Sequence, residues 1–112
     1  MKIAFTTKGK DWDAEMDPRF GRTEYLFIYD EQSGEETSLD NREVQSEAHG
    51  AGPKTAQKLA EAGAQVLITG NGPGGNAASV IQAAGITVYI GASSMSVKEA
   101  YQAYTSGKLS KQ

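Results

Sequence analysis

The chain has 112 residues, 13 glycines, no cysteine and a formal net charge of −3, and we expect residues 1–112 to form a single domain. Without cysteine, disulfide frameworks, thiolate nucleophiles and cysteine-ligated iron–sulfur clusters are excluded. The mild acidity argues against nucleic-acid binding, and no apolar run approaches the roughly 20 residues that span a bilayer. The N-terminus is too short and polar for a signal peptide, so we expect a soluble cytoplasmic protein with neither nucleic-acid nor membrane partners.

The first half of the chain predicts three strands, at residues 3–7, 24–30 and 35–41. The second of these gives the strongest signal, because it is aromatic and β-branched. A turn at 31–34 predicts that the third strand returns antiparallel, as a polar strand suited to a sheet edge. The polar segments 8–22 and 42–49 are predicted loops.

The second half repeats one helical template three times. Small or apolar residues recur at i, i+3, i+4 and i+7 in segments that begin at Ala56, Ala77 and Val97. Glycines that suit a left-handed cap follow the last turns, at Gly63, Gly85 and Gly107. A capping box at Ser96–Glu99 marks the start of the third helix.

Apolar runs at 65–69 and 86–90 separate these helices and are typical of buried parallel strands. The predicted order is therefore β-β-β-α-β-α-β-α, with right-handed crossovers after an antiparallel hairpin. This order predicts an α/β protein with three layers, α/β/α, in which a mixed five-stranded sheet lies between the helices.

Ligands of such sheets bind outside the carboxyl ends of the parallel strands, where loops 8–22, 70–76 and 91–96 fall, joined by segment 48–54. Gly70, Gly72 and Gly75 formally match G-x-G-x-x-G, but no acidic residue follows the next strand to hold a ribose. This favours a tight strand-to-helix turn over a nucleotide site. A loop that binds a small anion ranks between these two interpretations.

Two further motifs each allow two interpretations. His49 precedes a Gly-Ala-Gly helix start, where a lone histidine is usually an exposed loop residue, yet it is the chain's one strong soft-metal ligand besides the methionines. In Asp17–Arg22, the arginines would clamp an anion, or Phe20 would fill the core while Asp17 and the arginines pair locally. Since no nucleophile elbow or carboxylate-lined strand end is present, we expect no enzymatic activity.

Three motifs, at Asp17–Arg22, His49–Lys54 and Ile68–Pro73, resemble the dinitrogenase iron–molybdenum cofactor biosynthesis family, of the NifX or NifB C-terminal type, in order over about Lys2–Leu109. The resemblance implies a ribonuclease-H-like motif without nuclease activity. It also implies binding or carriage of the iron–molybdenum cofactor, its precursor or a related Mo/Fe–S cluster, with a cluster donor or acceptor protein as partner.

By the same resemblance, the cluster would be surrounded by Arg19, Phe20, Gly21, Arg22, His49, Gly50, Lys54, Thr69, Gly70, Asn71 and Gly72. His49 would supply the one bond to metal, and the cationic side chains would offset the cluster's charge. One histidine without cysteine cannot ligate a cluster fully, so we expect weak, transient binding that suits a carrier.

Two alternatives remain open. One is a module for small anions or nucleotides, built from Gly70–Asn76 and the loop with Arg19 and Arg22. The other is an interaction domain without a small ligand, in which Trp12, Met16 and Phe20 form part of a protein contact.

Overall fold

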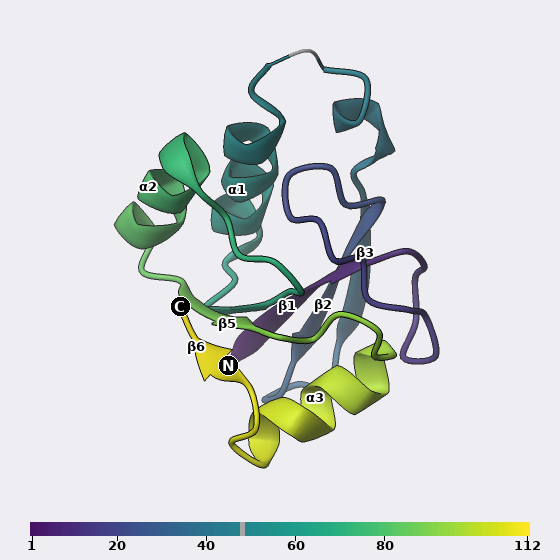
Figure 1. Ribbon diagram of the computed structural model, residues 1–112. Helices are drawn as coiled ribbons and strands as arrows, with labels where there is room; N and C mark the ends of the chain where they lie inside the picture. The colour runs from purple at the N-terminus through teal and green to yellow at the C-terminus, as the bar shows by residue number, and fades with distance from the viewer. Residues whose placement is uncertain (48) are drawn as a thin grey trace.

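The computed structural model describes residues 1–47 and 49–112. Its main elements, in chain order, are β1 (Lys2–Thr7), β2 (Tyr25–Asp30), β3 (Glu36–Asp40), α1 (Ala51–Ala62), β4 (Val66–Ile68), α2 (Gly75–Ala83), β5 (Thr87–Ile90), α3 (Val97–Thr105) and β6 (Ser110–Lys111). The strands form one sheet in the order β3-β2-β1-β4-β5-β6 (Figure 1).

The sheet is mixed, as predicted. The central strand β1 pairs antiparallel with β2 and parallel with β4, and β4 pairs parallel with β5. The carboxyl ends of β1, β4 and β5 therefore meet at one edge of the sheet, which is the edge where ligands of open α/β sheets bind.

Helices cover both faces of the sheet, with α1 and α2 on one face and α3 on the other (Figure 1). Alternate residues of β1 serve the two cores: Ala4 packs under α1 and α2, whereas Ile3 and Phe5 pack toward α3. All three side chains are fully buried. Burial on both faces explains why the central strands are continuous apolar runs without alternating polar residues.

The predicted fold class is confirmed, with three helices and a mixed sheet, and the α3 capping box between Ser96 and Glu99 forms. The count of five strands was wrong, because Ser110–Lys111 adds a sixth strand antiparallel to β5. Two polar residues carry no hydrophobic alternation, so no sequence pattern marks this strand.

The segment predicted as a loop over 42–49 also differs from expectation. Residues Arg42–Val44 form a short 3-10 helix, and Val44 is buried against the fold. A single apolar residue in a polar segment gives no periodicity, which is why the turn went unpredicted. The predictions over 42–49 and 48–54 include Ala48, which lies outside the described residues. No helix in the described parts of the chain is long and apolar enough to cross a membrane.

Candidate functional site

The loops at the carboxyl edge of the sheet are tied together by hydrogen bonds. The Asn71 amide donates to the carbonyl of Pro18 at 2.9 Å, and the Gly91 amide donates to the carbonyl of Gly70 at 3.1 Å. Inside the edge, the hydroxyls of Thr6 and Thr69 lie 2.8 Å apart in a buried hydrogen bond. Loops from three different strands thus form one continuous surface.

Glycines allow the backbones to approach closely at this edge. A Cβ on Gly70 would lie 2.8 Å from Pro18 Cα and would also meet the Ser93 hydroxyl. A Cβ on Gly21 would lie 2.9 Å from both the nitrogen and the Cα of Gly52, at the start of α1. These are distances that real Cβ atoms avoid, so the sites require glycine for packing and not for a left-handed backbone.

Arg19 is held by a buried carboxylate. Asp17 is fully buried, and its two carboxylate oxygens accept from Arg19 Nε at 3.0 Å and from Nη2 at 2.9 Å. This hydrogen-bonded pair raises the pKa of Arg19 above its ordinary value, opposed by partial burial. The local pairing considered from the sequence is therefore present for Arg19 and Asp17.

Phe20 and Arg22 fasten the same loop to its surroundings. Phe20 is 5% exposed and packs in the core under α1 and α2, so its ring fills the core, as one of the two interpretations of this motif expected. Arg22 donates from Nη1 to the carbonyl of Gln45 at 2.6 Å and from Nη2 to that of Glu47 at 2.8 Å. Arg22 thereby ties the segment that precedes His49 to the loop.

The start of α1 lies against this loop. Gly50 is the N-cap, with a left-handed backbone at φ 82° and no side-chain cap, and His49 directly before it is exposed. Thr55 in α1 donates its hydroxyl to the carbonyl of Gly21 at 2.7 Å. Lys54, in the first turn, forms an ion pair with Glu47. The start of α1 therefore lies beside Arg19–Arg22, and the partial positive charge of the helix N-terminus falls there.

The structure thus brings most of the predicted binding residues to one region. Contacts link the loop with Arg19–Arg22 to the start of α1 and to the turn at Thr69–Gly72. The sequence reasoning missed three neighbours of this surface, Thr6, Glu47 and Ser93. Only Thr6 carried a signal, since it is a polar residue ending an apolar strand.

The surface offers charge-compensated cations more than metal ligands. Among the described residues, no group of three or more His, Cys, Asp or Glu side chains could hold a metal ion. The cations are already engaged, Arg19 by Asp17 and Lys54 by Glu47. Such an arrangement can accept an anion through directed N–H groups while holding it weakly.

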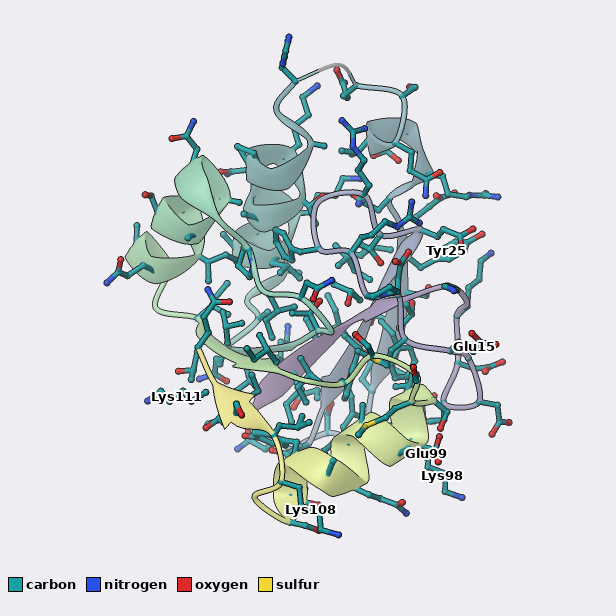
Figure 2. All side chains as sticks on the ribbon, viewed as in Figure 1. Glu15, Tyr25, Lys98, Glu99, Lys108 and Lys111 are labelled. Carbon is teal, nitrogen blue, oxygen red and sulfur yellow. The ribbon has the colours of Figure 1, made fainter. Side chains whose placement is uncertain are left out.

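The residues of the predicted protein contact do not form one surface. Met16 and Phe20 are buried, in the cores on opposite faces of the sheet. Trp12 packs edge-on against Tyr29, with ring centroids 4.9 Å apart, and lines a hollow of about 470 Å³ with Tyr101. The hollow lies on the α3 side of the sheet, where Figure 2 labels Lys98.

The fold is that of a small α/β protein whose glycine-rich loops meet at the carboxyl edge of the sheet. The chain matches the model of the family described as dinitrogenase iron-molybdenum cofactor over residues 1–107, and it belongs to that family. The family expected from the three motifs is thereby confirmed.

Two solved structures are similar over nearly their whole length. One is the apo form of the orange protein from Desulfovibrio gigas, at 37% identity and TM-score 0.92, covering 99% of this chain and 92% of that one. The other is the NMR structure of a Thermotoga protein described provisionally as NifB, at 38% identity and TM-score 0.82, covering 98% of this chain and 91% of that one. No curated protein sequence matches the chain.

Proposed function

We propose that this protein is a non-enzymatic carrier that binds an anionic metal–sulfur cluster: the iron–molybdenum cofactor, its precursor or a related Mo/Fe–S species. Membership of the iron–molybdenum cofactor family supports a role in handling clusters or cofactors. The observation that carries the proposal is the junction at the carboxyl edge, where the Arg19–Arg22 loop, the turn at Thr69–Gly72 and the start of α1 converge.

The physical chemistry of this junction suits such a cargo. Metal–sulfur clusters are bulky anions with soft acceptor atoms, and the partial positive charge at a helix N-terminus favours negative charge. His49 directly before α1 would give a single bond to metal. Because Arg19 and Lys54 already have anionic partners, the net attraction is modest, which favours release to an acceptor.

The same reasoning gives the expected partners. A weakly held cluster must be received from a donor protein and passed to an acceptor protein, so the protein acts between them in the cytoplasm. No step in this role makes or breaks a bond in an organic substrate, and the proposal therefore assigns no catalytic residue.

The experiment that tests the proposal is an anaerobic titration of the purified protein with tetrathiomolybdate, a soluble molybdenum–sulfur anion, followed by visible absorbance and bound molybdenum. We expect saturable binding that weakens roughly tenfold in His49→Ala, because the four-coordinate molybdenum anion loses a hydrogen bond that the His49 ring donates to one of its sulfur atoms. Lys108→Ala is the matched control, since Lys108 is an exposed cation on the α3 side, after that helix (Figure 2).

Two results would count against the proposal. Equal binding by the unsubstituted protein, His49→Ala and Lys108→Ala would show that His49 takes no part in binding. Thermal stabilisation by inorganic phosphate or a nucleotide, with no uptake of molybdenum, would favour the small-anion module instead.

A further inference from the structure

The chain contains the same Asp-x-Arg hydrogen-bond pattern twice. In each copy, one carboxylate oxygen accepts from both the backbone amide and Nε of the arginine, and the other oxygen accepts from Nη2. The distances are 3.0, 3.0 and 2.9 Å for Asp17 with Arg19. They are 2.9, 3.1 and 2.8 Å for Asp40 with Arg42. Equal local geometry means that any difference in role must come from the surroundings.

The surroundings differ sharply. The Asp17 side chain is 0% exposed, whereas that of Asp40 is 50% exposed. Asp17 also accepts from the Glu24 amide at 3.2 Å, and its backbone carbonyl accepts from the Thr6 hydroxyl at 2.8 Å. The Asp40 pair lies on the surface beside Tyr25, whose ring is 5.2 Å from the Arg42 guanidinium (Figure 2).

Burying the Asp17 carboxylate costs free energy of desolvation. The exposed pair of Asp40 and Arg42 shows that the same hydrogen-bond pattern forms without burial. A buried carboxylate is tolerated when several donors satisfy it, as four donors from Arg19 and Glu24 do here. The result is an arginine whose guanidinium is held by a buried carboxylate while its side chain stays 51% exposed. Fixing a long cationic side chain removes the rotamer freedom that a bound ligand would otherwise have to restrict.

The fixed orientation determines what Arg19 presents. A guanidinium has two edges suited to paired acceptors, and Asp17 occupies the one formed by Nε and Nη2. The second edge, formed by Nη1 and the outer hydrogen of Nη2, points away from Asp17. Arg19 lies in the loop that hydrogen bonds connect to two other parts of this edge. The carbonyl of Pro18 accepts from the Asn71 amide, and the carbonyl of Gly21 accepts from a side chain of α1.

We propose that Asp17 is a positioning residue of the cargo site, which holds Arg19 so that its second edge donates two directed hydrogen bonds to the anionic cargo. This inference rests on the proposed carrier function and deepens it. Because Asp17 balances the charge of Arg19, the arginine recognises the cargo by the direction of its N–H groups and not as a point charge. The cargo must therefore offer two neighbouring acceptor atoms, sulfur or oxygen, to one planar fork.

The test is a double-mutant cycle on the affinity for tetrathiomolybdate, with thermal unfolding of each variant measured in parallel. We expect Arg19→Ala to weaken binding roughly tenfold, and Asp17→Asn to weaken it about as much, because the lost orientation of Arg19 outweighs the positive charge that the substitution unmasks. The double variant should be no weaker than Arg19→Ala alone. Asp40→Asn removes the same local pattern on the surface and should bind like the unsubstituted protein.

A second variant keeps the test valid if Asp17→Asn fails to fold. Arg19→Lys retains the charge but cannot form the planar fork, so we expect it to bind as weakly as Arg19→Ala. Lysine binding as well as arginine would overturn the inference, as would additive losses from Asp17→Asn and Arg19→Ala. If the unsubstituted protein takes up no tetrathiomolybdate, the carrier proposal and this inference both fall; if it binds and Asp17→Asn binds equally, only this inference falls.

Discussion

Gly70 is a residue at which two loops of the carboxyl edge approach each other closely. A Cβ at this position would lie 2.8 Å from Pro18 Cα and would collide with the Ser93 hydroxyl. The backbone of Pro18 cannot move without disturbing the adjacent Asp17, which is fully buried. The geometry of the proposed site therefore depends on the absence of one methyl group.

Gly70→Ala is accordingly expected to destabilise the protein by about 2 kcal/mol, the usual range for forcing an extra carbon into a packed region. Gly74→Ala is the control in the same turn, because a Cβ there meets nothing within 4 Å and its φ of −125° suits any residue. We expect the control to cost no more than about 1 kcal/mol, through a weaker N-cap. Urea unfolding measures both, and equal losses would show that the close approach is unimportant.

Tyr101 is a second residue whose surroundings make a measurable prediction. Its hydroxyl donates to the Glu31 carboxylate at 2.5 Å, and this bond, with added burial, raises the pKa of Tyr101 to about 12 from an ordinary value of 10.0. The folded protein thus retains a proton that the unfolded chain releases. Its contribution to stability is complete below pH 10 and is lost as the pH rises toward 12.

We therefore expect the unsubstituted protein to lose more stability than Tyr101→Phe between pH 10 and pH 12. The phenylalanine keeps the ring that packs on Trp12 but has no proton to lose. Urea midpoints measured across this interval give the comparison. Parallel curves for the two proteins would mean that the Glu31 bond does not form in solution.

Among the elements, α3 has the best-defined start. The Ser96 hydroxyl accepts from the Glu99 amide at 3.1 Å, and the Glu99 carboxylate accepts from the Ser96 amide at 2.9 Å. The Ser96 amide that donates to the Glu99 carboxylate, together with the Ser96 hydroxyl, holds the pKa of Glu99 below its ordinary value. The helix also carries Val97 and Ala100 into the core beneath it, so the cap is coupled to packing.

We expect Ser96→Ala to cost about 1 kcal/mol, the usual value for an N-cap. A separate test uses Glu99→Ala. Its loss of folding stability should be complete above pH 4.5, the ordinary pKa of Glu, and should shrink as acid protonates Glu99 in the folded unsubstituted protein. Thermal unfolding over an acid pH series measures it. A deficit that does not change with pH would show that the charge of Glu99 has no part in the cap.

The helices and central strands could be predicted because each has a local pattern. The start of α3 followed from a capping box, and the end of α1 from Gly63, which has the left-handed φ of 77°. The strand β6 could not be predicted, since its pairing with β5 depends on where the preceding chain places two polar residues.

The site was only partly predictable for a similar reason. The motifs identified the loops, but not that Asp17 would be buried beneath Arg19 or that Arg22 would bind two backbone carbonyls. Those contacts join residues up to 25 positions apart and have no periodic signal. The structure thus separates arginines that look equivalent in the sequence: Arg22 fastens the fold, and Arg19 faces outward from a buried anchor.

At the scale of the whole molecule, the sheet separates two surfaces with different chemistry. Its carboxyl edge gathers glycine-rich loops, amides and the exposed His49. On the α3 side, Trp12, Tyr29 and Tyr101 pack together around a hollow. The carrier proposal places cargo on the first surface alone, so the position of bound cargo distinguishes the two surfaces.

The most direct test is to map backbone amide chemical shifts of isotope-labelled protein during anaerobic titration with tetrathiomolybdate. We expect the largest changes at Arg19–Arg22, at His49–Gly50 and at Thr69–Gly72, while amides around Trp12 and Tyr101 change little. Changes concentrated at the aromatic hollow, or an absence of changes at saturating tetrathiomolybdate, would contradict the carrier proposal.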